Sequence, residues 1–204
     1  MKLAILDGGS SLQKAQGVVR TYPSIWQGSV VDVGCRSREL ETALMGHRVR
    51  YQGVDVDPSA EIVADLGEKL PFDDKTINVV AALDVLEHTD DIHHAFSELC
   101  RVAKDHIVIT LPNCYEVNTR LRFLRGKPLS DKYGLPSAKP QDRHRWLFSL
   151  HESRKFIHDC AVEQSWRVVD ERIIVGPRSR HIAYAVRRWP NLLCKTYLTL
   201  LAPR

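Results

Sequence analysis

The sequence predicts an α/β protein built on a doubly wound, mostly parallel sheet. Ser29–Leu40 begins with an apolar run that ends in a tight turn at Gly34 and leads into a helix, as in the first βα unit of such a sheet. Ile77–Leu83 is a continuous apolar run, which is typical of a parallel strand buried on both faces. Asp91–Ala103 then carries its apolar residues at helical spacing.

Composition favours one domain, residues 1–204, with an insertion, because the chain has 204 residues of which 44% are hydrophobic. The apolar run Leu3–Leu6 is too short for the core of a signal peptide, and no run approaches the ~18 apolar residues of a membrane span. The five cysteines have no CxxC spacing. These features predict a cytoplasmic protein with reduced thiols and without a disulfide framework or a zinc site.

The net charge of +4 is unevenly distributed along the chain. Residues 112–148 contain eight Lys/Arg and three Asp/Glu, and residues 166–204 contain eight and two. The remainder is therefore mildly acidic. This distribution predicts an anionic substrate or an anionic surface as the partner, although arginines that only keep the surface soluble would give the same balance.

The helices on either side of the turn have clear limits. A first helix is expected over Ser11–Thr21, where Tyr22-Pro23 ends it. Residues 1–10 contain two glycines but lack a full GxGxxG pattern, so they are not interpreted as the first strand of a dinucleotide-binding unit. After the turn, a helix is expected over Ser37–Met45, with Gly46 as its stop.

The second strand is predicted over Val49–Asp55 and the third over Ile62–Ala64. Too few residues separate them for the helix that normally joins parallel strands, so this helix is expected to be missing. An acidic side chain at the end of the second strand can accept hydrogen bonds from both ribose hydroxyls of an adenosine ligand. Asp55 is the candidate and Asp57 the alternative, although an Asp beside a proline is also common in turns.

A long basic segment separates the predicted fifth strand, His106–Leu111, from the helix that follows. Residues 114–148 are punctuated by prolines and too long for a plain connection, which predicts a substrate lid. Ser149 and Glu152 then form a capping box that opens the next helix.

Two strands are expected to close the fold, Arg167–Val175 and His181–Arg187, with a turn at Gly176-Pro177. The tail, residues 189–204, combines leucines with flanking cations. It either lies on a membrane surface or packs on its own domain or on a second subunit.

Two motifs resemble those of class I S-adenosylmethionine (SAM)-dependent methyltransferases. Val30–Cys35, VVDVGC, resembles motif I, whose usual form is roughly VLDVGCGxGxL, with Arg36 and Arg38 at positions that are normally glycine. The stretch 60–88, ending in VLEH, is similar to a block of the methyltransferase type 11 group, which includes the ubiquinone-biosynthesis enzymes. The resemblance implies a Rossmann-like sheet of seven strands that ends in an antiparallel C-terminal strand.

The same resemblance implies SAM as the cofactor and assigns residues to it. Asp55 would bind the ribose hydroxyls, Asp65 the adenine amino group, and the Leu66 backbone would lie against the adenine ring. The residues at the carboxyl ends of the strands complete the expected cofactor site: Asp32, Gly34, Cys35, Arg36 and Asp84.

Methyl transfer needs an aligned nucleophile, exclusion of water and often a base for the substrate proton. His88, directly after Glu87, is the candidate base, and His144 in DRHRW is its rival. In the alternative interpretation, Glu87 and His88 only cap the next helix and hydrogen-bond the lid.

A second possibility is a divalent metal. Asp84-x-x-Glu87-His88 is similar to the E-x-x-E-H element of the small-RNA 2′-O-methyltransferases, in which a later histidine, here His144, completes the ligands. VLEH is also widespread among methyltransferases that use no metal, and Asp84 replaces the longer glutamate. No metal is therefore assigned from the sequence.

The resemblance implies methyl transfer to a hydroxyl or similar nucleophile of a polar or anionic small molecule, glycan or lipid-linked intermediate. One alternative is an RNA 2′-O-methyltransferase-like enzyme with a divalent metal, although no aromatic-basic RNA-binding module is evident and nucleic acid is not the expected partner. Another is a non-catalytic scaffold that lost SAM binding through Arg36 and Arg38. Peripheral membrane contact is expected, if anywhere, at the C-terminal tail.

Overall fold

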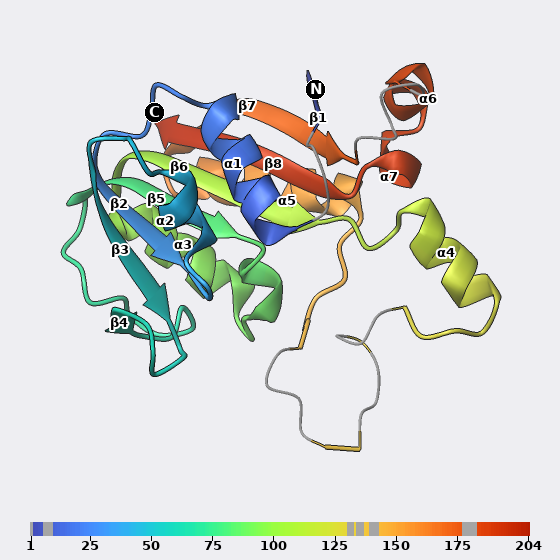
Figure 1. The fold of residues 1–204 in the computed structure, drawn as a ribbon, viewed down its shortest axis with the longest axis horizontal. Coiled ribbons are helices and arrows are strands. Elements are labelled where there is room, and N and C mark those ends of the chain that lie inside the picture. Colours follow the sequence, from blue (N-terminus) through green and yellow to red (C-terminus); the bar gives the residue numbers. More distant parts are fainter. Residues whose placement is uncertain (1, 6–9, 130–132, 134–136, 139–142, 177–182) are drawn as a thin grey trace.

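The protein forms an eight-stranded sheet with helices on both faces (Figure 1). The computed structural model describes residues 2–5, 10–129, 133, 137–138, 143–176 and 183–204. The strand order is β1-β7-β8-β6-β5-β2-β3-β4, and every pairing is parallel except those of β8. The strands are β1 Lys2–Ile5, β2 Gly28–Val33, β3 Val49–Asp55, β4 Ile62–Val63, β5 Ile77–Leu83, β6 Ala103–Pro112, β7 Trp166–Val175 and β8 Thr196–Pro203.

Two hydrophobic cores hold helices against the two faces of the sheet. On one face, α1 and α2 pack through residues such as Val18 and Leu40, and on the other α3 and α5 pack through Phe96 and Ile157. Figure 1 shows α1 in front of the sheet and α5 behind it. The helices are α1 Ser11–Thr21, α2 Glu39–Ala43, α3 Ile92–Val102, α4 Val117–Leu124, α5 Leu150–Glu163, α6 Ala183–Arg188 and α7 Pro190–Leu193, with a 3₁₀ turn at Leu86–His88.

The structure confirms the predicted fold class. Helix α1 has the predicted limits and begins with a capping box between Ser10 and Gln13, and a second capping box between Ser149 and Glu152 opens α5. No helix lies between β3 and β4, as expected from the short connection. Strand β1 extends the predicted seven-strand arrangement at its outer edge, where it pairs with β7.

The C-terminal part of the chain differs from the prediction. Residues 181–187 were expected to form the antiparallel partner of β7, but Ala183–Arg188 is helix α6 and the partner is β8, between β6 and β7. The leucines of the tail are therefore core residues: Leu198 and Leu200 face one core and Leu201 the other. Membrane contact through these side chains is excluded, because they are buried inside the sheet.

The order of the strands creates a switch point at the carboxyl ends of β2 and β5, which is where doubly wound sheets bind ligands. From β2 the chain moves toward β3, whereas β5 leads to β6 on the other side. Gly34, with a φ of 75°, lets the two loops meet: a Cβ atom there would lie 2.5 Å from Cγ2 of Val85. The candidate site must therefore be sought at this edge.

Three parts of the predicted lid, residues 130–132, 134–136 and 139–142, lie outside the described residues. Residues 177–182 also lie outside them, and these include His181 and Ile182 at the start of the second predicted closing strand. Among the helices that the structure describes, none has the length and apolar character needed to cross a membrane.

Candidate active site

The loop after β2 is fastened to the end of β3 by backbone hydrogen bonds. The amides of Gly34 and Cys35 both donate to the carbonyl of Val54, at 2.8 and 3.1 Å. The next amide, that of Arg36, donates to Oδ2 of Asp55 at 3.0 Å. Oδ1 of the same carboxylate accepts the amide of Asp57 at 3.1 Å. The Asp55 carboxylate is thus fixed at the mouth of the loop, the position expected for a ribose-binding group.

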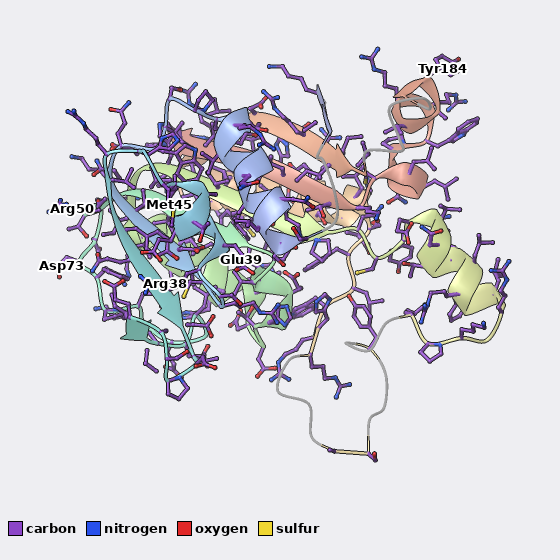
Figure 2. The ribbon with its side chains drawn as sticks, in the orientation of Figure 1. Arg38, Glu39, Met45, Arg50, Asp73 and Tyr184 are labelled. Atoms are coloured by element: carbon purple, nitrogen blue, oxygen red, sulfur yellow. The ribbon has the colours of Figure 1, made fainter. Side chains whose placement is uncertain are left out.

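The two arginines at the usual glycine positions adopt the glycine-like backbone conformation. Arg36 and Arg38 have φ angles of 44° and 59°, in the left-handed region that L-residues rarely visit. The Arg38 guanidinium pairs with Glu41 at 2.9 Å and Glu61 at 3.2 Å, and lies over the Tyr51 ring. Figure 2 shows Arg38 beside β3. Its side chain is therefore held by acidic groups around the loop.

Asp32 supports the loop from beneath instead of lining the floor of the cleft. Only 4% of this residue is exposed, and its carboxylate accepts a hydrogen bond from the Tyr51 hydroxyl at 2.9 Å. Burial raises the pKa of Asp32 to about 7, an effect that the Tyr51 hydrogen bond opposes. Cys35 is also buried, and burial raises the pKa of its thiol to about 11, so it is an inert packing residue.

On the expected adenine side, Asp65 is exposed and Leu66 is buried just after β4. Oδ1 of Asp65 accepts the amide of Gly67 at 2.8 Å, which orients the carboxylate within its turn. The amide of Ala64 donates to the carbonyl of Asp55, so the two acidic ends lie on adjoining strands. Because no helix follows β3, nothing of that kind covers this side of the cleft.

Asp84 occupies the switch point at the end of β5, with a left-handed φ of 54°. Its Oδ1 accepts a hydrogen bond from the Thr110 hydroxyl at 2.7 Å, and its Oδ2 forms an ion pair with Lys14. Lys14 lies on α1, 70 residues before Asp84 in the sequence, and the packing of α1 on the sheet brings it to the cleft. Lys14 belongs to no sequence motif, because its contact with Asp84 depends on how α1 packs on the sheet.

Glu87, His88 and His144 form a compact cluster next to this point. Glu87 is fully buried, and Nε2 of each histidine lies 3.9 Å from its Oε1. The two imidazole rings meet edge to face, with centroids 4.5 Å apart. One donor atom from each of the three residues lies within 4.8 Å of the others. The structure thus brings together the predicted base, its rival and the neighbouring carboxylate.

A second layer orients the two imidazoles. Nδ1 of His88 lies 3.2 Å from the carbonyl of Arg143, which can only accept, so this nitrogen carries a proton and Nε2 faces Glu87. Nδ1 of His144 lies 2.7 Å from the Tyr133 hydroxyl, which in turn lies 2.8 Å from Sγ of Cys114. Sequence reasoning missed Tyr133 and Cys114, which have no motif and meet His144 only in the folded chain.

The end of the predicted lid is docked onto the same 3₁₀ turn. The amide of Arg145 donates to the carbonyl of Glu87 at 2.8 Å, and the indole of Trp146 donates to the carbonyl of Thr89 at 2.9 Å. One interpretation expected Glu87 and His88 to cap the following helix and to hydrogen-bond the lid. Both residues contact the lid, through the Arg143 carbonyl and the Arg145 amide, but neither caps the helix. The N-cap of α3 is Asp91, which accepts the amides of His93 and His94.

The fold and the cleft define the class of doubly wound α/β proteins that bind an adenosine cofactor at the switch point. The sequence matches a family described as a methyltransferase domain over residues 14–159, which is more than half of the chain. The protein therefore belongs to this methyltransferase family. No curated protein sequence matches it.

Solved structures share the fold. A SAM-dependent methyltransferase from Archaeoglobus fulgidus has 18% identity and a TM-score of 0.64, with 96% of this chain and 95% of that chain covered. The magnesium protoporphyrin IX methyltransferase from Synechocystis PCC 6803, solved with bound SAH, has 13% identity and a TM-score of 0.58, with 97% and 89% covered. A Haloferax volcanii methyltransferase in complex with the Trm112 activator has 17% identity and a TM-score of 0.56, with 89% and 84% covered.

SAM is the cofactor of this family, and the residues present fit it. Arg36 and Arg38 keep the backbone conformation that glycine would have in the loop after β2. The Asp55 carboxylate lies at the end of β3, and the Arg38 side chain forms ion pairs with Glu41 and Glu61. The cluster of Glu87, His88 and His144 lies beyond the carboxyl end of the neighbouring strand β5. The loop expected to hold SAM and the cluster of Glu87, His88 and His144 thus follow the adjacent strands β2 and β5.

Proposed function

We propose that this methyltransferase transfers a methyl group to a hydroxyl or similar nucleophile of a polar or anionic molecule, and that Glu87, His88 and His144 handle the proton. One observation carries the proposal: a fully buried carboxylate faces two imidazole nitrogens beside the cofactor cleft. Such a pairing supports a histidine base, because the carboxylate stabilises the imidazolium that forms when the base takes a proton.

SAM supplies an electrophilic methyl group when bound. In this proposal, Asp55 and Asp65 orient the cofactor, and the switch-point residues Asp84 and Lys14 shape the methionine end of the cleft. Nε2 of His88 would take the proton of the acceptor hydroxyl as its oxygen gains the methyl group, with His144 supporting the cluster. SAM would supply that methyl by loss of its carbon–sulfur bond and would leave as SAH. The Arg143 carbonyl holds the proton on Nδ1 of His88, which leaves its Nε2 as the proton acceptor in the neutral ring.

The charge of the lid supports an anionic acceptor. Residues 112–148 contain eight Lys/Arg and three Asp/Glu, and the end of this segment docks on the Glu87 turn. We propose that the segment closes over the acceptor and excludes water, with its cations facing acidic groups of the substrate. An anionic glycan or a lipid-linked intermediate has this chemistry.

A metal-assisted transfer is the second candidate, because the donor atoms of Glu87, His88 and His144 lie within 4.8 Å of one another. One carboxylate and two imidazoles suit Mn²⁺, Fe²⁺ or Zn²⁺. The contacts to Nδ1 of both histidines are of the kind that orient metal ligands. The metal would then lower the pKa of the acceptor hydroxyl in place of a free histidine base.

The test uses methyl-labelled SAM with anionic glycans and lipid-linked sugars as acceptors. His88→Asn and His144→Asn should each lower transfer by about 10²- to 10⁴-fold, the usual contribution of a general base, and leave SAM binding intact. His158→Asn is the control, since His158 is half-exposed and contacts Glu171 on the distant strand β7. Wild-type transfer in both variants would refute the proposal.

A further inference from the structure

Helix α4 carries large apolar side chains, yet all of its residues are exposed except Val117 and Thr119, which are half-buried. None of its residues is buried. Leu124 is 78% exposed, Phe123 70% and Leu121 41%. Figure 1 shows α4 projecting from the sheet on its own. A helix that shows apolar side chains to water in this way marks an interaction surface.

The apolar and basic residues of α4 follow a pattern. Val117, Leu121 and Leu124 are spaced four and three residues apart, so they form one stripe along the helix. Arg120 and Arg125 lie on either side of this stripe. An apolar stripe flanked by cations is typical of helices that lie in the surface of a lipid bilayer.

The charge around the helix has one sign. Arg120, Arg122, Arg125 and Lys127 are all exposed over this short stretch. The single acidic residue beside them, Glu116, is occupied as the N-cap of the helix, where it accepts the amides of Asn118 and Thr119. Cations close to an anionic bilayer strengthen binding to it.

Helix α6 and the residue that follows it add aromatic side chains at the same end of the molecule (Figure 1). Tyr184 is 82% exposed and projects away from the sheet, and Trp189 is 53% exposed with the Arg188 guanidinium 5.9 Å from its ring centroid. The adjoining α7 is tied to the residue that precedes the lid, because Nδ2 of Asn113 donates to the carbonyl of Asn191 at 2.8 Å. Tyrosine and tryptophan are the residues that anchor proteins at the headgroup level.

We propose that α4, with Tyr184 of α6 and Trp189 as a second contact, seats this face of the enzyme on an anionic lipid bilayer. The choice of a bilayer over a protein partner rests on the charge: cations flank the apolar stripe on both sides, and within residues 115–129 the one acidic side chain, Glu116, is engaged by amides of the helix. Cys114, three residues before the start of α4, reaches His144 through Tyr133, so the seated helix places the mouth of the site at the lipid surface.

This inference deepens the proposed function, because it favours a lipid-linked acceptor presented at the bilayer. Only this choice of substrate rests on the proposed function. Lipid binding itself is independent of methyl transfer. A chain that binds vesicles but transfers no methyl group would refute the proposed function alone, and a chain that transfers methyl groups to a free glycan but ignores vesicles would refute this inference alone.

The experiment is sedimentation of the full-length protein with vesicles of phosphatidylcholine, with and without phosphatidylserine. Binding is expected only to the anionic vesicles and should weaken with added salt. Leu121→Ser with Leu124→Ser should lower the partition coefficient at least about tenfold, because two apolar side chains would no longer be buried in the bilayer. Arg120→Gln with Arg125→Gln should lower it about tenfold or more through the charge alone.

The matched control is Val162→Ser, which removes a 54%-exposed apolar side chain from α5. Its binding to vesicles should equal that of the wild type. SAM affinity, measured by calorimetry, should be the same in all variants, which shows that each is folded. Absence of wild-type binding to anionic vesicles would overturn the proposal. The proposal would also be overturned if the protein formed a dimer in solution that dissociates when Leu121→Ser and Leu124→Ser are combined, since the stripe would then contact a second copy.

Discussion

The backbone amide of Arg36 donates a hydrogen bond to Oδ2 of Asp55 at 3.0 Å, across two neighbouring strands of the sheet. This contact joins the loop after β2 to the acidic end of β3 and fixes the carboxylate before any ligand arrives. Each carboxylate oxygen can accept more than one hydrogen bond, so both remain able to receive a ribose hydroxyl. The loop and the proposed ribose site are therefore held together before any ligand binds.

Asp55→Ala should weaken SAM binding about tenfold to a hundredfold, because hydrogen bonds to a charged group contribute roughly 1.5–3 kcal/mol each. Calorimetric titration with SAM measures this, and thermal unfolding checks that the variant is folded. Asp57→Ala is the control, since the Asp57 carboxylate is used locally by the amide and hydroxyl of Ser59. If Asp57→Ala weakened SAM binding and Asp55→Ala did not, the ribose site would belong to Asp57.

Gly34→Ala should lower the free energy of unfolding by about 2 kcal/mol or more. The added Cβ would lie 2.5 Å from Cγ2 of Val85, in addition to the cost of a side chain at a φ of 75°. Gly46→Ala is the control: its φ is 93° but no atom lies within 4 Å, so only the backbone cost of about 1 kcal/mol applies.

Urea unfolding of Gly34→Ala, Val85→Gly and the double variant measures the contact itself. The two substitutions should couple favourably, by about 0.5–3 kcal/mol, because the second removes the atoms that the first strikes. Strict additivity would show that Gly34 is required only for its backbone conformation.

Asp32 should make the protein less stable as the pH rises between about 4 and 7. Its pKa is raised from the model-peptide value of 3.8 to about 7 by burial, so over this range the unfolded chain loses the proton and the folded chain keeps it. Below this range both states are protonated and the difference vanishes. The loss reaches at most about 4 kcal/mol above pH 7, since one pKa unit corresponds to about 1.4 kcal/mol.

Asp32→Asn isolates this contribution, because the amide oxygen can still accept the Tyr51 hydroxyl. The stability of the variant relative to wild type should rise from pH 4 to pH 7 and then level off. Urea unfolding at a series of pH values gives the difference. A constant difference across the range would show that Asp32 titrates normally.

If the cluster holds a metal, Mn²⁺ or Zn²⁺ should bind the wild type, and His88→Ala or His144→Ala should weaken binding strongly. Calorimetric titration of chelator-treated protein provides the measurement, which needs no methyl acceptor. His158→Ala should bind like the wild type, since this half-exposed histidine lies near Glu171 only. Equal affinities in all variants would eliminate the metal, and the histidine-base mechanism would remain.

Much of the fold could be predicted because the signals were local. The limits of α1 and β5 follow from caps and apolar periodicity, and the absence of a helix between β3 and β4 follows from chain length. The tail was harder, because leucines flanked by cations suit both an interfacial helix and a buried strand. The tail forms strand β8 because it pairs with β6 and β7, which sequence patterns within the tail do not reveal.

The residues of the candidate site that belong to sequence motifs could be predicted, and those that only the fold brings together could not. Glu87 and His88 stand in a motif, and His144 was proposed as a rival base for His88; the structure places both histidines against one carboxylate. Lys14 and Tyr133 could not be found from the sequence, since each reaches the site from a distant element and belongs to no pattern.

The place of β8 has a consequence for how the chain acquires its structure. Residues 196–203 form the only link in the described sheet between the β1–β7 pair and the remaining five strands. Contacts of such long sequence separation form slowly, because the intervening chain must be ordered first. Until Thr196–Pro203 is inserted, β6 and β7 each present an open strand edge that invites association between chains. Expression of C-terminally shortened forms should therefore yield aggregates instead of a smaller folded protein.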